Sequence, residues 1–125
     1  MNDSEINVLV VDDDSSVRKS IVMFLKMENF KVFSASSGNQ AIDIVTNNKI
    51  HFILSDIKMP EMDGMELLKN IRAANPDIPI IVLMTGYSQY SKEELLDSGA
   101  QDMIHKPFDM EKISQQIRDA VSQTS

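Results

Sequence analysis

Five short apolar runs, separated by segments with helical spacing, constrain the fold of this chain more than any other feature. The runs are rich in β-branched residues and cover residues 6–11, 31–35, 51–55, 78–84 and 102–105. The first, third and fourth are almost continuously apolar rather than alternating, which is typical of strands buried on both faces of a parallel sheet. The pattern therefore predicts strands that are covered by helices on both sides.

The segments between these runs carry apolar residues at the spacing of amphipathic helices. Val17, Ile21 and Leu25 follow one another at four-residue intervals, and Ile113, Ile117 and Val121 do the same near the C-terminus. Two other segments open with the cap-x-x-Glu spacing of a capping box, at 63–66 and 91–94. Five strands alternating with five helices predict an α/β fold, a doubly wound parallel sheet with right-handed crossovers.

Length and composition exclude several classes of protein. A chain of 125 residues fits one compact domain, and its net charge of −7 disfavours direct binding to nucleic acid. The absence of cysteine excludes a disulfide framework, a thiolate nucleophile and a cysteine-based zinc site. No apolar run approaches the roughly 20 residues of a membrane span, and the acidic start "MNDSEIN" lacks the order of a signal peptide. A cytoplasmic location is the resulting expectation.

Polar side chains follow four of the five predicted strands. The first strand runs into Asp12 and Asp13, the third into Asp56, the fourth into Thr85 and the fifth into Lys106. In open α/β sheets, functional groups gather at the carboxyl ends of the strands, where the strand order reverses. With the order 2-1-3-4-5 the second strand lies at an edge, which explains why it offers no charge. We therefore expect these side chains to share one rim of the sheet.

The chemistry of this set favours a metal ion and a phosphoryl group. Three clustered carboxylates, Asp12, Asp13 and Asp56, raise one another's pKa unless a cation joins them, and oxygen ligands suit Mg²⁺. The three carboxylates give −3, whereas one Mg²⁺ and Lys106 give +3, so the resting site is neutral on paper. A phosphoryl group would be held by the metal, Lys106 and Thr85, with a carboxylate as the nearest nucleophile. Attack by that carboxylate would give an acyl phosphate.

Four motifs resemble those of a known family. The segments are "VVDDD" (10–14), "SDIKMPEMDG" (55–64), "LMTG" (83–86) and "HKPF" (105–108), and together they resemble the receiver domain of response regulators in two-component signalling. The resemblance extends over residues 6–121. It implies a single flavodoxin-like domain across residues 1–125, in which residues 122–125 form a tail or the start of a linker.

The resemblance also implies a role for each site residue. Asp56 would be the phosphoacceptor, while Asp12, Asp13 and Asp56 would bind Mg²⁺ together with the backbone carbonyl of Lys58. Thr85 would contact the phosphoryl group and reorient on activation, and Lys106 would pair with its oxygens. The bond between Lys106 and Pro107 is expected to be cis.

Three positions depart from the usual pattern or tune it. Receivers usually carry an aromatic switch residue three positions before the lysine, and here that position is Met103, a flexible side chain that fills a pocket in several rotamers. Lys58 and Tyr87 stand beside the phosphosite and differ from the pair found in fast-resetting chemotaxis receivers. We expect Tyr87 to shield the acyl phosphate from water.

The partners follow from the same resemblance. The phosphoryl donor would be a phosphohistidine of a sensor histidine kinase or of a histidine phosphotransfer protein. The domain would be no enzyme beyond catalysing its own phosphorylation and dephosphorylation. Phosphorylation would change the face formed by the fourth helix, fifth strand and fifth helix, which would contact an output domain or protein. A phosphorylation-linked homodimer stays open, and neither nucleic acid nor membrane is an expected direct partner.

Two alternative functions stand beside this interpretation. A haloacid-dehalogenase-type phosphatase also uses Mg²⁺, a strand-end aspartate, a threonine and a lysine, and Asp12 with Asp14 forms an Asp-x-Asp. That family, however, resembles a larger domain with a cap and has a second acidic pair after the lysine, where this chain offers only Asp109 and Glu111. The other alternative is a receiver-like domain kept only for phosphorylation-independent docking.

Overall fold

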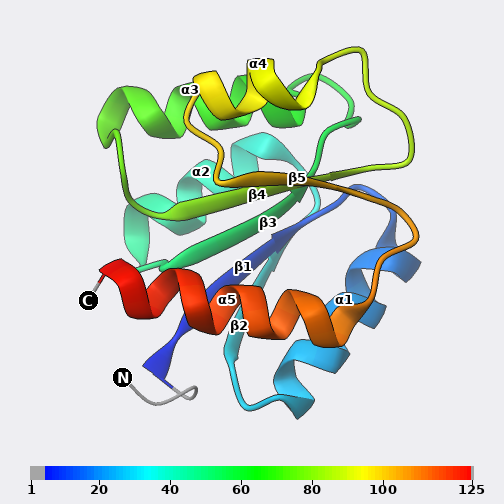
Figure 1. Ribbon diagram of the computed structural model, residues 1–125, viewed down its shortest axis with the longest axis vertical. Helices are drawn as coiled ribbons and strands as arrows, with labels where there is room; N and C mark the ends of the chain where they lie inside the picture. Colours follow the sequence, from blue (N-terminus) through cyan, green and yellow to red (C-terminus); the bar gives the residue numbers. More distant parts are fainter. Residues whose placement is uncertain (1–4, 125) are drawn as a thin grey trace.

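The computed structural model describes residues 5–124, in which strands and helices alternate along the chain (Figure 1). The strands are β1 (Asn7–Val11), β2 (Lys31–Ala35), β3 (Phe52–Asp56), β4 (Ile80–Thr85) and β5 (Asp102–His105). The helices are α1 (Ser15–Met27), α2 (Gly38–Asn47), α3 (Gly64–Ala74), α4 (Lys92–Asp97) and α5 (Met110–Thr124). This order confirms the predicted α/β class.

All neighbouring strands run parallel, in the order β2-β1-β3-β4-β5. Strand β1 pairs with β2 on one side and β3 on the other, so that Val8 lies opposite both Val32 and Phe52. The direction of winding reverses between β1 and β3. The predicted strand order is therefore confirmed, and the reversal places the ends of β1 and β3 side by side.

Two apolar layers enclose the sheet, and successive residues of each strand alternate between them. Val8 and Val10 pack with residues of α1 and α5, whereas Leu9 and Val11 pack on the other face. Figure 1 shows α1 and α5 on one side of the sheet and α2, α3 and α4 on the other. We call the second layer the α2–α4 core; it includes Leu9, Val11, Ile53, Ile57, Met65, Leu67, Leu68, Leu83 and Leu95. Burial on both faces explains why the central strands read as continuous apolar runs.

Some element boundaries differ from those expected. β4 begins at Ile80 rather than at residue 78, because Pro79 has no N–H to donate to a neighbouring strand. The Lys106–Pro107 bond is cis as expected, and the Ile78–Pro79 bond is cis as well. α5 continues through residues 122–124, where a tail was expected, because no proline or glycine stops the helix there. Residue 125, the rest of that predicted tail, lies outside the described residues.

Local signals for helix ends hold in the structure. Both predicted capping boxes form: Asp63 with Glu66 at α3 and Ser91 with Glu94 at α4. Gly99 ends the turn after α4 with a φ of 110°, a conformation that favours glycine. These caps fix where the loops on the carboxyl side of the sheet begin and end.

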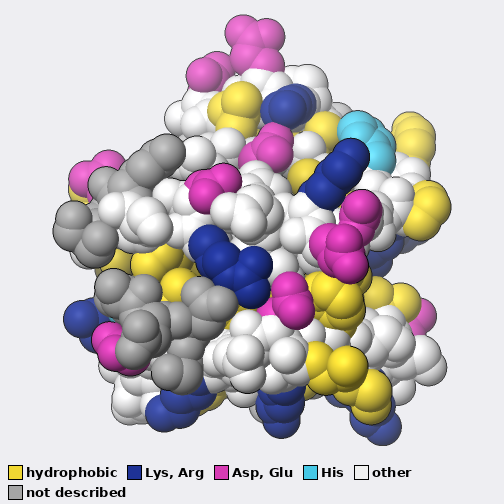
Figure 2. Space-filling model, turned by 60° about the horizontal axis from the view of Figure 1, so that its bottom comes forward, with side chains coloured by type: hydrophobic (Ala, Val, Ile, Leu, Met, Phe, Trp, Pro, Cys, Tyr) yellow, Lys and Arg dark blue, Asp and Glu magenta, His cyan; other side chains and the backbone are white. Residues whose placement is uncertain are grey.

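The surface carries mixed charge. On the face in Figure 2, acidic and basic side chains are interspersed, with groups of hydrophobic side chains between them. The exposed methionines Met23 and Met27 of α1 lie among Arg18, Lys19 and Lys26. Within residues 5–124 no helix has the length and hydropathy needed to cross a membrane.

Candidate functional site

The ends of β1, β3, β4 and β5 surround one open cavity of about 660 Å³. Its walls contain all the polar residues that the sequence placed at these strand ends, and the surrounding loops complete it. The lining residues are Asp12, Asp13, Asp14, Asp56, Lys58, Met59, Pro60, Thr85, Gly86, Tyr87 and Lys106. The expected convergence at one rim of the sheet is therefore present.

Three carboxylates form the floor and one wall of this cavity. Asp12 is fully buried, Asp56 is 9% exposed and Asp13 is exposed. One oxygen from each lies within 4.8 Å of the others. This spacing lets a single cation reach all three oxygens, and an all-oxygen set with one open side suits Mg²⁺, which retains several waters. The donor set therefore fits the predicted metal.

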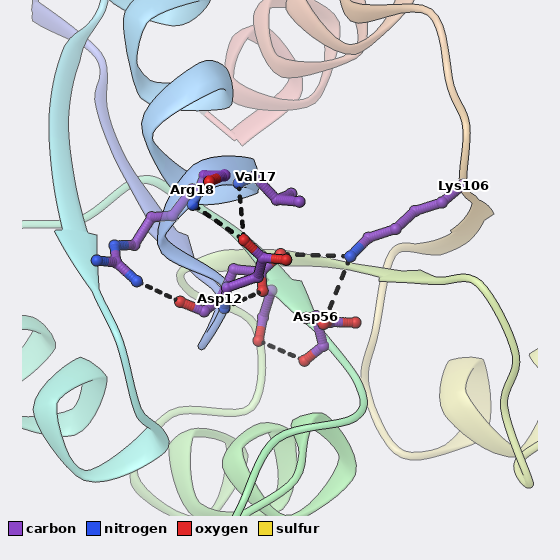
Figure 3. Close-up of polar contacts among 8 residues, drawn as sticks. Asp12, Val17, Arg18, Asp56 and Lys106 are labelled. Atoms are coloured by element: carbon purple, nitrogen blue, oxygen red, sulfur yellow. Dashed lines mark hydrogen bonds and ion pairs between the residues drawn. The ribbon is translucent and has the colours of Figure 1, made fainter.

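Lys106 forms ion pairs with two of these carboxylates. Its Nζ lies 3.3 Å from Oδ2 of Asp12 and 3.4 Å from Oδ2 of Asp56 (Figure 3). Desolvation by burial raises the pKa of Asp56, Lys106 opposes that shift, and the nearby Asp12 adds to it. The cavity is lined by four carboxylates and two lysines, so negative charge is in excess there.

The remaining contacts around Asp12 hold the end of β1 in place. Oδ1 of Asp12 accepts a hydrogen bond from the backbone N–H of Asp14 at 2.9 Å, and Arg18 donates to the backbone carbonyl of Asp12 at 2.7 Å. Asp14 itself caps α1, because its Oδ1 accepts hydrogen bonds from Ser16 and Val17. The side chain of Asp14 is therefore engaged at the start of α1.

Thr85 is the buried hydroxyl of the site. Its side chain is 1% exposed, and Oγ1 has no hydrogen-bond partner among residues 5–124. Its carbonyl accepts the backbone N–H of Lys106 at 2.8 Å, so the ends of β4 and β5 are joined beside the cavity. A buried hydroxyl without a partner is costly. A ligand oxygen in the cavity would remove that cost.

The loop after β3 returns the chain closely beneath Asp56. The N–H of Gly64 donates to the carbonyl of Ile57 at 2.7 Å. A Cβ at position 64 would lie only 2.7 Å from the backbone oxygen of Asp56, so glycine is needed for this close approach. The start of α3 therefore rests directly on the backbone that presents Asp56.

The predicted tuning positions line the cavity, whereas Met103, a predicted switch position, does not. Lys58 is exposed, and Tyr87 is 81% exposed although it lines the cavity. Met103 is partly buried against the α2–α4 core, away from the cavity walls.

Sequence reasoning missed Tyr90. Its hydroxyl donates a hydrogen bond to Oδ2 of Asp63 at 2.7 Å, across 27 residues of sequence. Nothing in the loop "TGYSQYS" distinguishes this tyrosine from Tyr87, which is largely exposed. The signal for its role is its tertiary partner, which only the fold reveals.

Residues 8–118 match the response regulator receiver domain, and the chain belongs to that family. It is therefore a receiver domain of the response regulators of two-component systems, a class of signalling domain.

Named relatives and solved structures agree with this assignment. The chain is 35% identical over 120 residues to the response regulator MprA of Mycobacterium sp. (strain KMS), covering 96% of the chain and 52% of that protein. It is 38% identical over 125 residues to the transcriptional regulatory protein ZraR of Klebsiella oxytoca, covering 99% of the chain and 28% of that protein. The chain thus spans about half the length of MprA and less of ZraR.

Among solved structures, the Francisella response regulator 1452 receiver domain superposes with a TM-score of 0.89 at 27% identity, covering 97% of this chain and 100% of that one. The Thermotoga maritima response regulator TrrA, solved in complex with Mg²⁺ and BeF, gives a TM-score of 0.82 at 25% identity, covering 92% and 98%. These similarities extend over nearly the whole of the described fold.

Proposed function

We propose that this receiver domain accepts a phosphoryl group on Asp56 from a phosphohistidine of a sensor kinase or of a histidine phosphotransfer protein. The observation that carries the proposal is the meeting of three carboxylates, the hydroxyl of Thr85 and the ammonium of Lys106 around one open cavity. Asp56 is the carboxylate at the end of β3, in the centre of this set. It is buried enough to be poorly solvated and open enough to be reached.

Asp12, Asp13 and Asp56 would hold Mg²⁺, with the backbone carbonyl of Lys58 as a further ligand. The fit rests on the oxygen donors within 4.8 Å of one another and on the negative charge that Lys106 alone does not balance. When bound, Mg²⁺ supplies charge compensation for the phosphoryl oxygens. The related TrrA structure contains Mg²⁺ with BeF, which agrees with this assignment.

The transfer itself needs few groups from the protein. An Oδ of Asp56 attacks phosphorus while the P–N bond to the donor imidazole breaks, and the electron pair returns to the imidazole nitrogen, which takes up a proton. The product is an acyl phosphate on Asp56. Lys106 already lies 3.4 Å from Asp56 and would pair with the oxygens of the incoming group, while the free hydroxyl of Thr85 would donate to another.

The same contacts would switch the α4-β5-α5 face. Phosphorylation adds negative charge beside Thr85 and Lys106, which lie at the ends of β4 and β5. Both residues would gain contacts with phosphoryl oxygens only in the phosphorylated state, so the populations of two conformations would shift. Met103 belongs to β5, packs against the α2–α4 core and would adjust its rotamer as the loop moves. An output domain or protein, or a second copy of the chain, would recognise the altered face.

The test is mass spectrometry after incubation with a small phosphodonor and Mg²⁺. The wild type is expected to gain one covalent phosphate, Asp56→Asn none, and the matched control Asp97→Asn, an exposed residue of α4, one. Equal labelling of wild type and Asp56→Asn would overturn the assignment of Asp56. Release of inorganic phosphate from small phosphomonoesters over many turnovers would favour the phosphatase alternative, and an unlabelled wild type would favour the docking alternative.

Tyr87 and Lys58 would set the lifetime of the acyl phosphate. Tyr87 stands 81% exposed at the mouth of the cavity, where its ring can restrict the approach of water. Tyr87→Ala is expected to lose phosphate faster than the wild type. Equal rates of dephosphorylation would remove this role from Tyr87.

A further inference from the structure

Tyr90 connects two loops that border the proposed phosphorylation site. Its hydroxyl donates to Oδ2 of Asp63 at 2.7 Å, while Oδ1 of the same carboxylate accepts the N–H of Glu66 at 2.8 Å and so caps α3. One oxygen of Asp63 therefore accepts a hydrogen bond from its own helix, and the other accepts a hydrogen bond from the β4–α4 loop. A hydrogen bond to an ionised acceptor is shorter and stronger than a neutral one.

The ring of Tyr90 is anchored as well as its hydroxyl. It is partly buried and packs against the α2–α4 core, the same layer that Met103 contacts. Donation to Asp63 raises the pKa of Tyr90, so the phenol keeps its proton and remains a donor at neutral pH. Tyr90 directly precedes Ser91, the cap of α4, so its hydrogen bond to Asp63 lies beside the start of that helix.

Asp63 in turn is held close to Asp56. Gly64, its neighbour, approaches the backbone of Asp56 so closely that an added Cβ would lie 2.7 Å from the carbonyl oxygen. Asp63 is thus fixed by the α3 cap on one side and by the backbone under Asp56 on the other. It cannot follow a movement of the β4–α4 loop without disturbing both.

The opposite end of that loop is Thr85. Residues 86–89 lie between the hydroxyl that would contact a phosphoryl group and the tyrosine that is hydrogen-bonded to Asp63. Three of these four residues are exposed, and an added Cβ at Gly86 would meet no atom within 4 Å. A displacement of Thr85 toward a phosphoryl group would therefore move a short, largely exposed segment whose far end is held at Tyr90.

We propose that the Tyr90–Asp63 hydrogen bond is a latch that holds the β4–α4 loop in its unphosphorylated position and that opens when the loop closes on a phosphoryl group. This inference rests on the proposed function. Tyr90 is a positioning residue here, because it acts through the loop and does not touch the reacting atoms. A bond made in one conformation and lost in the other biases the equilibrium between them, and its removal favours the conformation that lacks it.

An ion pair at the start of α4 connects this helix to other elements than α3. Lys92 pairs with Asp102 of β5 at 3.0 Å, and the other oxygen of Asp102 accepts Gln116 of α5 at 3.1 Å. These contacts join α4 to β5 and α5, the elements of the face that would change. The hydrogen bond to Asp63 joins the β4–α4 loop to the N-terminal end of α3, beside the loop under Asp56. At the other end of α3, Arg72 donates to the carbonyl of Gly99, in the turn after α4, at 2.9 Å.

The experiment measures the affinity of the protein for beryllium fluoride in the presence of Mg²⁺, as a probe of the phosphoryl group, by calorimetric titration. Tyr90→Phe keeps the ring and removes the donor, and Asp63→Ser keeps a capping oxygen for α3 and removes the acceptor. Each variant is expected to bind the probe roughly threefold to tenfold more tightly than the wild type, as the loss of one hydrogen bond to a partly exposed charged group implies. The double variant is expected to bind no more tightly than either single variant.

A second readout needs no ligand. In amide spectra of the unliganded protein, the resonances of residues 86–92 of Tyr90→Phe are expected to move toward their positions in the probe-bound wild type. Unchanged or weaker probe binding by Tyr90→Phe, with a lower melting temperature, would mean that the hydrogen bond is merely structural and would overturn the latch alone. A wild type that does not bind the probe at all would overturn the proposed function and the latch with it.

Discussion

Replacing Gly64 with alanine tests how tightly α3 is packed under Asp56. The added Cβ would lie 2.7 Å from the backbone oxygen of Asp56 and 2.8 Å from Cα of Ile57. Both are backbone atoms in or beside a buried strand, so neither can rotate away and the loop must shift. Overpacking of this kind costs about 1–3 kcal/mol. Alanine returns at most about 1 kcal/mol through its better helix propensity, because Gly64 is the first residue of α3. From about 2 kcal/mol, the middle of the overpacking range, this leaves a net loss of about 1–2 kcal/mol in the free energy of unfolding.

Chemical denaturation followed by circular dichroism measures this loss, and a thermal scan should show a melting temperature lowered by roughly 3–10 °C for a domain of this size. Gly86→Ala is the matched control, since the same methyl group meets no atom within 4 Å there. Its stability is expected to stay within about 0.5 kcal/mol of the wild type. If Gly64→Ala is as stable as the wild type, or Gly86→Ala is the weaker of the two, the close approach of α3 to Asp56 does not have the cost assigned to it.

Three further outcomes are expected. Burial raises the pKa of Asp56 above its ordinary value of 3.8, so the folded state carries the cost of a desolvated charge once the pH exceeds that raised pKa. Asp56→Asn should therefore have a higher melting temperature than the wild type at pH 7 without metal. An equal or lower melting temperature would contradict this. Mg²⁺ should stabilise the wild type by about 1.4 kcal/mol at ten times its Kd, and Asp13→Asn, in which an exposed ligand is lost, should require a higher concentration for the same shift in a thermal scan. Burial, with a smaller effect of Lys49, lowers the pKa of His51 below 6.5, and Nδ1 of His51 accepts the N–H of Asn7. The free energy of unfolding should therefore fall as the pH drops from about 6.5. In His51→Asn, whose Oδ1 can accept the same N–H, the denaturation midpoint should fall less over that pH range.

Features that depend on neighbouring residues in the chain could be predicted from the sequence. Continuous apolar runs identify strands buried on both faces, and the spacing from Asp63 to Glu66 identifies a cap, because each pattern is satisfied within one element. The meeting of Asp56, Thr85 and Lys106 was also predictable, since carboxyl ends of parallel strands share one edge once the strand order is known. Strand limits were less certain, as the later start of β4 at Ile80 illustrates.

Contacts between loops could not be predicted in this way. The hydrogen bond from Tyr90 to Asp63 joins residues 27 apart, and Arg72 donates to the carbonyl of Gly99, which is also 27 residues away. Neither pairing follows from the periodicity of any element. Both depend on how α3 and the β4–α4 loop are placed over the sheet, which is decided by the packing of the α2–α4 core.

The arrangement of local and long-range contacts bears on how such a domain can switch. Asp12, Asp56 and the backbone below them are fixed by the sheet and by the close approach of Gly64, so the acidic part of the site is rigid. Thr85 is buried, but its hydroxyl has no hydrogen-bond partner among residues 5–124, and residues 86–89 after it are largely exposed. A new negative charge in the cavity would therefore lie between the rigid acidic residues and Thr85, which would gain a hydrogen bond by moving toward that charge. The free energy released at Thr85 is opposed by the hydrogen bond at Tyr90, and the difference between these two terms decides how strongly phosphorylation is coupled to α4.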